Sequence, residues 1–200
     1  MLLIIDSATA ACSAALIDPD GALIDERHEL VGRGHAERLL PMVAELLGGR
    51  VPAAILVDCG PGSFTGVRVS LAAAHGLAIG WKVPLAGYSS LAAIAAVSGE
   101  AEAAVALVGG HGELFVQSYG GDPLAPLDEL RSLAPADAAA AVSAELVLGS
   151  GAEALIAARG SGRWRGALPR AADARLLPPS LRTLAPRPIY GRAPDARPMP

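Results

Sequence analysis

The stretch from residue 53 to residue 80 constrains the fold of this chain more than any other. A short apolar run, Ala53 to Val57, precedes the sequence Asp-Cys-Gly-Pro-Gly-Ser-Phe-Thr-Gly-Val-Arg, and a long run of small residues then ends at Gly80. The three glycines free the backbone to turn and to approach a neighbour closely. Ser63 and Thr65 can offer side-chain oxygens to the first free N–H groups of a helix. The stretch therefore predicts a strand, a glycine loop and a helix.

Three known loop motifs resemble this one, and its spacing departs from each of them. A P-loop has a lysine directly after its last glycine, whereas Val67 follows Gly66 here. The dinucleotide fingerprint G-x-G-x-x-G is one residue shorter than the spacing from Gly60 to Gly66. A nucleophile elbow places glycine two residues before its serine, and this loop has Pro61 there. The spacing favours a tight turn between packed elements, and anion binding at the N-terminus of the following helix stays open as an alternative.

The loop resembles the signature of the bacterial TsaB (YeaZ) family, which reads approximately G-x-G-P-G-S-F-T-G-[LV]-R. Further segments resemble the family in the same order along the chain, at residues 3–13, 34–41, 83–91 and 189–192. The resemblance covers residues 1–100 well and is thin from about 120 to 185. The loop residues that carry it are Gly60, Pro61, Gly62, Ser63, Phe64, Thr65, Gly66 and Arg68.

This resemblance implies an α/β protein with the actin-like fold (the ASKHA, RNase H-like architecture) of two related βββαβα-type subdomains, the second one trimmed. We expect an N-terminal subdomain over residues 1–100, a C-terminal subdomain over 101–185 and a Pro/Arg-rich tail over 186–200. The family is a non-catalytic paralogue of TsaD, the transferase that makes N6-threonylcarbamoyladenosine (t6A) in tRNA. The resemblance thus implies a scaffold subunit that binds and activates TsaD.

Two predicted helices carry the partner surface that the resemblance implies. One runs from His35 to Leu47 with an apolar stripe at helical spacing, and the other follows the loop over 67–80. The second helix has two small faces, one with Gly66, Ser70, Ala74 and Ala78 and one with Ala72, Gly76 and Gly80. Small faces let helices approach closely, so the second face needs a neighbouring helix of this chain or a partner. The surface candidates are Ala36, Leu39, Leu40, Val43, Ser70, Ala73, Ala74 and Leu77.

The resemblance also implies further partners and leaves rival functions open. TsaE, a P-loop ATPase, would dock on the pair of TsaB and TsaD, and tRNA would be reached through the complex. Free family members also form homodimers, so a free-standing homodimer without TsaD is one alternative. The other is an ATP-dependent phosphotransferase of the same fold, for which residues 149–151, Gly-Ser-Gly, are the only candidate for a second phosphate loop.

No catalytic, metal or cofactor residue is predicted. TsaD has an H-M-E-[GA]-H motif where this chain has Ser90, Leu91, Ala92, Ala93 and Ile94. Serine and isoleucine do not replace imidazole at a transition-metal site, so neither protease nor metal-dependent transferase chemistry is expected. Asp6 and Thr9, in the turn after the first strand, are expected to bond the backbone rather than a phosphate. His35 is expected to be solvated or part of an interface.

Charge and composition bound the remaining possibilities. Residues 159–200 contain nine arginines against two aspartates, a charge of +7 in a chain of net charge −4. A basic tail can contact RNA, whereas the single lysine of the whole chain, Lys82, points to biased codon usage instead. The apolar fraction of 52% argues against disorder. Two cysteines, no predicted signal peptide and no apolar run near the ~20 residues of a membrane span predict a cytoplasmic protein.

Hydrophobic patterns predict the order of the other elements. Residues 1–28 form three strands, of which Leu2 to Ile5 is a buried central strand. The remaining expected elements are a strand over 84–87, a helix over 89–97, two strands within 103–119, a helix over 136–142, a strand over 146–149, a helix over 152–159 and an irregular tail from Pro178.

Overall fold

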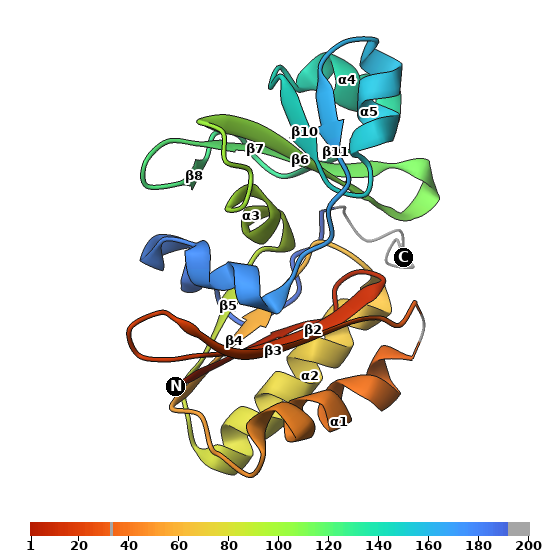
Figure 1. The fold of residues 1–200 in the computed structure, drawn as a ribbon. Coiled ribbons are helices and arrows are strands. Elements are labelled where there is room, and N and C mark those ends of the chain that lie inside the picture. The colour runs from red at the N-terminus through yellow and green to blue at the C-terminus, as the bar shows by residue number, and fades with distance from the viewer. Residues whose placement is uncertain (33, 192–200) are drawn as a thin grey trace, which may run out of the picture.

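The computed structural model describes residues 1–32 and 34–191, and in this part of the chain two β-sheets lie one above the other (Figure 1). The first sheet has the strand order β3-β2-β1-β4-β5. Its strands are β1 (Leu2–Asp6), β2 (Ala11–Ile17), β3 (Leu23–Leu30), β4 (Ala54–Asp58) and β5 (Leu85–Tyr88). The first three strands form an antiparallel meander, and β4 and β5 continue the sheet parallel to β1.

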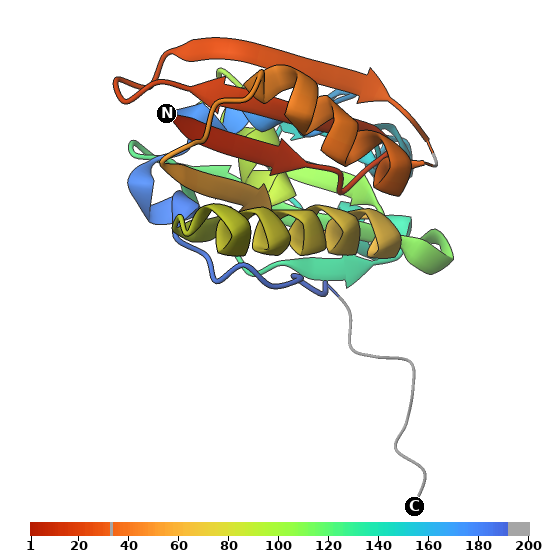
Figure 2. The same ribbon diagram turned by 90° about the horizontal axis from the view of Figure 1, so that it is seen from below.

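Helices α1 (His35–Leu47) and α2 (Phe64–Trp81) lie side by side and cover the outer face of the first sheet (Figure 2). The apolar stripe of α1 packs on β2, and Gly48 ends the helix in a left-handed conformation with its N–H on the Ala44 carbonyl. The predicted bounds of α1 are confirmed. Helix α2 starts three residues earlier than predicted because Ser63 caps it: the Ser63 hydroxyl accepts the N–H of Gly66 at 3.2 Å.

The second sheet repeats this plan at a smaller size. Its order is β11-β10-β6-β7-β8, with β9 also paired to β7. The strands are β6 (Glu102–Val108), β7 (Leu114–Gly120), β8 (Ala125–Pro126), β9 (Arg131–Leu133), β10 (Leu146–Leu148) and β11 (Arg163–Arg165). Again a central strand, β6, has an antiparallel neighbour on one side and parallel strands on the other. Its helices, α4 (Pro135–Ala141) and α5 (Ala152–Arg159), are shorter than α1 and α2. The prediction of an actin-like fold with a trimmed second half is confirmed.

A central core joins the two sheets. Helix α3 (Ser90–Ala95) lies between them with the 3-10 helices η2 (Ala171–Leu176) and η3 (Pro179–Arg182) (Figure 1). Buried side chains of the first sheet, of α3, of the second sheet and of η2 form one hydrophobic cluster. Two further clusters lie under α1 and α2 and under α4 and α5. The halves therefore share a buried apolar layer.

The C-terminal segment returns to the first sheet after the second sheet is complete. Leu184 exchanges backbone hydrogen bonds with Gly87 of β5 at 2.7 and 3.0 Å, and the Ile189 N–H donates to the Cys59 carbonyl at 2.8 Å. The tail predicted to be irregular from Pro178 begins with the 3-10 helix η3, and its described part, to residue 191, then packs along the edge of the first sheet; residues 192–200 lie outside the described residues. No helix in the described part of the chain has both the length and the apolar character to cross a membrane.

Candidate functional site around the glycine loop

The glycine loop closes tightly on the turn between β1 and β2. The Ser63 N–H donates to the Ala8 carbonyl at 2.6 Å, and the Ser7 hydroxyl donates to the Gly66 carbonyl at 2.8 Å. A Cβ atom on Gly62 would lie far inside van der Waals contact with the Ala8 carbonyl oxygen, and one on Gly66 would meet the Ser7 carbonyl oxygen in the same way. The loop glycines are thus required for close backbone approach, which supports the interpretation of the loop as a turn between packed elements.

Arg68 connects the loop region to the C-terminal segment. Its guanidinium lies 3.3 Å from the centroid of the Phe64 ring and donates a hydrogen bond of 3.0 Å to the Tyr190 hydroxyl. A cation over an exposed aromatic ring contributes about 0.5–1 kcal/mol. Two segments that resemble the family, the loop and the stretch around Tyr190, therefore meet in space. Thr65, which could also have capped the helix, lies exposed in its first turn.

Two buried carboxyl groups lie beneath the loop, and the sequence analysis missed their pairing. Asp6 and Asp58 end β1 and β4, which are parallel neighbours, so both side chains reach the same edge of the sheet. Asp58 accepts hydrogen bonds from the Gly60 N–H at 2.6 Å and from the Ser90 hydroxyl at 2.7 Å. Asp6 accepts from the Ala8 N–H at 3.0 Å, as predicted, and from the Tyr88 hydroxyl at 3.4 Å.

Burial makes these carboxyl groups hard to ionise. It raises the pKa of Asp6, and it raises the pKa of Asp58 well above the ordinary value, with a further increase from the negative charge of Asp6. The pair joins the ends of two strands and supports the loop from below.

The positions that match the TsaD metal motif are occupied by core residues. Ser90 is fully buried and donates to Asp58, and Ile94 is buried among the apolar residues of the central core. Within residues 1–32 and 34–191 no group of three or more His, Cys, Asp or Glu side chains is placed to hold a metal ion. The expectation for His35 was wrong: the ring is buried, and Nε2 donates to the Thr9 carbonyl at 2.7 Å. Thr9 itself bonds the backbone as predicted, since Oγ1 accepts the Ala11 N–H.

The surface formed by α1 and α2 differs from the predicted one. Four candidates are buried in the core between the helices and the sheet, so they are not surface residues: Leu39, Val43, Ser70 and Ala74. Ala73 and Leu77 are half-buried between the two helices, whereas Ala36 and Leu40 are exposed. The stripe of α2 that faces the sheet is therefore the one that contains Ser70 and Ala74. The other small stripe, Ala72, Gly76 and Gly80, lies on the surface.

Large apolar side chains accompany this exposed stripe of α2. Ile79 is 77% exposed and Phe64 is 65% exposed, at opposite ends of the helix. Val67 and Leu71, which face the sheet at helical spacing with Ala74 and Ala78, are the signal that could have identified the buried stripe from the sequence. The outer face of α2 is thus lined by small residues, with an exposed apolar residue near each end of the helix.

A cleft of about 900 Å³ opens between the two subdomains beside the loop. Its lining comes from the β1–β2 turn, from the loop and the start of α2, from the β6–β7 turn and from residues 188–191. Ser150 of the candidate second phosphate loop also lines it. Gly149 and Gly151 of that loop pack against β6, where a Cβ on Gly149 would collide with the Ala106 carbonyl oxygen.

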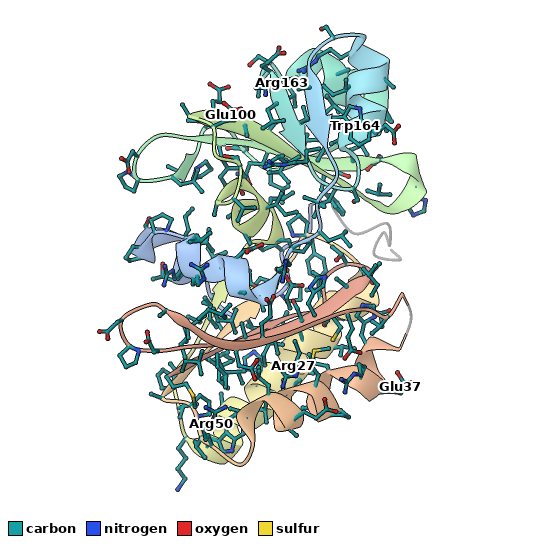
Figure 3. All side chains as sticks on the ribbon, in the orientation of Figure 1. Arg27, Glu37, Arg50, Glu100, Arg163 and Trp164 are labelled. Atoms are coloured by element: carbon teal, nitrogen blue, oxygen red, sulfur yellow. The ribbon has the colours of Figure 1, made fainter. Side chains whose placement is uncertain are left out.

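Many arginines of the basic C-terminal region form hydrogen bonds or ion pairs with other groups of this chain. Arg159 donates to the carbonyls of Val142 and Ala144 at 2.9 Å each. Arg163, beside Trp164 on the outer edge of the second sheet, pairs with Glu100 at 3.1 Å (Figure 3). Arg170 pairs with Glu26 at 2.7 Å, and Arg182 donates to the Leu177 carbonyl at 2.7 Å. Arg192 and Arg197 lie outside the described residues. These contacts give the arginines structural roles that need no RNA.

Comparison with known proteins identifies relatives of this chain. The family model described as TsaD, tRNA N6-adenosine threonylcarbamoyltransferase, matches residues 28–175. The tRNA threonylcarbamoyladenosine biosynthesis protein TsaB of Escherichia coli is 42% identical over 99 residues, which are 47% of this chain and 42% of the relative. The protein of the same name from Haemophilus influenzae is 42% identical over 101 residues, 47% of this chain and 41% of the relative. The chain spans less than half of the length of these curated relatives.

Solved structures extend the match to nearly the whole fold. YeaZ from Pseudomonas aeruginosa superposes with a TM-score of 0.80 at 29% identity and covers 94% of this chain and 98% of that chain. A second Pseudomonas aeruginosa structure, described as similar to peptidase YEAZ, gives 0.78 at 29% identity and covers 96% and 99%. With the family model over most of the sequence, these matches show that the chain belongs to the TsaB (YeaZ) family.

Proposed function

We propose that this chain is a non-catalytic subunit that binds TsaD and supports the transfer of a threonylcarbamoyl group to an adenine of tRNA. The assignment to tRNA threonylcarbamoyladenosine biosynthesis comes from the names of its relatives. The observation that carries the proposal is the exposed outer face of α2, on which Ala72, Gly76 and Gly80 lie in line beside Ile79.

This outer face has the properties of a helix-docking surface. Small residues let a second helix approach α2 closely, and exposed apolar side chains near the ends of α2 gain from burial. The exposed residues Ala36 and Leu40 of α1, the latter 49% exposed, extend the surface on the neighbouring helix. We therefore revise the candidate interface to Ala36, Leu40, Ala72, Gly76 and Ile79, with Ala73 and Leu77 at its inner border.

The chemistry of the site supports a partner rather than an enzyme. The positions that match the TsaD ligands hold Ser90 and Ile94, both in the core. The glycines at 62 and 66 serve contact with the β1–β2 turn, and Gly149 serves contact with β6. The transfer itself is then assigned to TsaD. TsaE would dock on the complex of this chain with TsaD, and tRNA would be reached through that complex.

Co-purification with the TsaD of the same organism tests this proposal. Ala72→Arg places a long charged side chain on the outer face of α2 without touching the core, because Ala72 is exposed. The matched control is Ala157→Arg, at an exposed alanine of α5 in the second subdomain. We expect TsaD to be retained by the wild type and by the control and lost with Ala72→Arg. Ala74→Arg is not a usable variant, because Ala74 is 0% exposed and the change would disrupt the core.

Failure of the wild type to retain soluble TsaD would overturn the proposal. If both variants retain TsaD, TsaD remains the partner but the outer face of α2 is refuted as its binding surface. If this face instead forms a homodimer and binds no TsaD, the wild type should be a dimer that added TsaD does not change. Ala72→Arg should then be a monomer.

A further inference from the structure

The cleft between the two subdomains has the size and walls of a small-molecule site. Its volume of about 900 Å³ lies within the range of roughly 300–1,000 Å³ that ligand pockets occupy. Aromatic and aliphatic side chains from both subdomains form its walls, among them Phe64, Phe115, Ile189 and Tyr190. An apolar or aromatic group of a ligand would lose contact with water on entering it, which favours binding.

Three hydroxyl groups of the lining can donate hydrogen bonds to a ligand, whereas a further one, that of Ser132, already donates to Glu113. Three hydroxyl oxygens of the lining each accept a backbone N–H, so each hydroxyl still has its own hydrogen to donate. They come from three different turns and from both subdomains. The Thr9 hydroxyl accepts the Ala11 N–H at 3.3 Å and the Ser63 hydroxyl accepts the Gly66 N–H at 3.2 Å. The Ser150 hydroxyl accepts the Val108 N–H at 3.1 Å.

The charge of the lining is positive. Arg68 lines the cleft, and its contacts, the Phe64 ring and the Tyr190 hydroxyl, are both neutral. Among the described residues of the lining none is Asp or Glu, although the chain contains 20 acidic residues. The 18-residue helix α2 begins at the cleft, and its dipole adds to the positive potential there.

We propose that this cleft binds an organic anion without a metal ion, an apolar or aromatic body that carries a carboxylate or a phosphate beside Arg68. We infer binding without a metal ion because the described lining contains no carboxylate that could hold one. Proteins bind magnesium nucleotides through one or two carboxylates in addition to the phosphates. Asp6 and Asp58 are fully buried beneath the loop and do not line the cleft. The site therefore discriminates against MgATP. This inference does not depend on the proposed function.

Calorimetric titration of the purified chain with naphthyl phosphate, naphthoate, naphthol and MgATP tests the proposal. We expect an anionic naphthyl compound to bind more tightly than neutral naphthol, and MgATP to give no heat of binding. The tighter of the two anions identifies the head group.

Variants of Arg68 locate the binding. Arg68→Met keeps an apolar contact with Phe64 but removes the charge, and should weaken anion binding about tenfold or more, since a hydrogen bond to a charged group is lost. Arg68→Lys should restore most of the affinity, and Arg163→Met, at an exposed arginine outside the cleft, should not change it. Circular dichroism verifies that each variant is folded, and Thr9→Val provides a second cleft variant. The proposal fails if neither anion binds, if naphthol binds equally well, if MgATP binds more tightly, or if Arg68→Met leaves the affinity unchanged.

Discussion

Two glycines of the same helix, Gly66 and Gly76, should respond to alanine in opposite directions. Gly66 lies in the first turn of α2, where a methyl group would collide with the Ser7 carbonyl oxygen. Gly76 lies in the middle of α2, and nothing stands within 4 Å of the Cβ that alanine would add. The pair separates the effect of close packing from the effect of helix propensity.

The expected changes in the free energy of unfolding follow from three contributions. Forcing a methyl group into packed surroundings costs about 1–3 kcal/mol. Displacement of Ser7 also weakens its hydrogen bond to Gly66, worth about 1 kcal/mol. Alanine gains up to about 1 kcal/mol over glycine in a helix. Gly66→Ala should therefore destabilise the chain by about 1–3 kcal/mol, and Gly76→Ala should stabilise it by about 0.5–1 kcal/mol.

Urea unfolding followed by circular dichroism measures both values. A shift of the midpoint at constant m-value reports the change in stability. If the loop glycines served ligand contact instead of contact with the β1–β2 turn, Gly66→Ala would be as stable as Gly76→Ala. That equality would refute our account of the loop.

Three substitutions at buried residues and one at the exposed Leu40 test the packing and the buried hydrogen bonds. Leu39→Ala should cost about 2–5 kcal/mol because Leu39 is fully buried, whereas Leu40→Ala should cost about 1 kcal/mol or less, and urea unfolding distinguishes them. Ser90→Ala should cost about 1–3 kcal/mol by the same measurement, because Asp58 loses a buried hydrogen bond, and an unchanged midpoint would contradict this. Asp6 and Asp58 have raised pKa values in the folded chain, so above the ordinary carboxyl value of 3.8 the folded state binds more protons than the unfolded state. Stability should thus fall as pH rises from 3.8 through the folded-state pKa values, and Asp58→Asn should reduce this slope and increase stability at neutral pH, as unfolding at a series of pH values would show.

Local patterns predicted the first helix and the loop closely. Helix α1 runs from His35 to Leu47 as expected, because its apolar stripe and its glycine stop are both local signals. The loop was interpreted as a packed turn because every catalytic spacing failed, and its contacts with the β1–β2 turn agree.

Other features depend on contacts between distant segments and could not be predicted in the same way. The pairing of Asp6 with Asp58 requires β1 and β4 to be neighbours, which is a property of the sheet. Both faces of α2 are small, so the stripe with Ser70 and Ala74 could be assigned to the core only from the larger Val67 and Leu71. Strand β11 was not predicted, because its residues, Arg163, Trp164 and Arg165, are all exposed and lack the apolar run that identified the equally short β10.

Sedimentation velocity of this chain mixed with TsaD is the most direct test of the central claim, that this chain is a subunit of a complex with TsaD. The account predicts a single heavier species that contains both proteins, formed at the expense of any homodimer. Ala72→Arg should abolish that species and Ala157→Arg should preserve it. If wild-type chain and TsaD sediment as two independent species at concentrations where both are folded, the claim is contradicted.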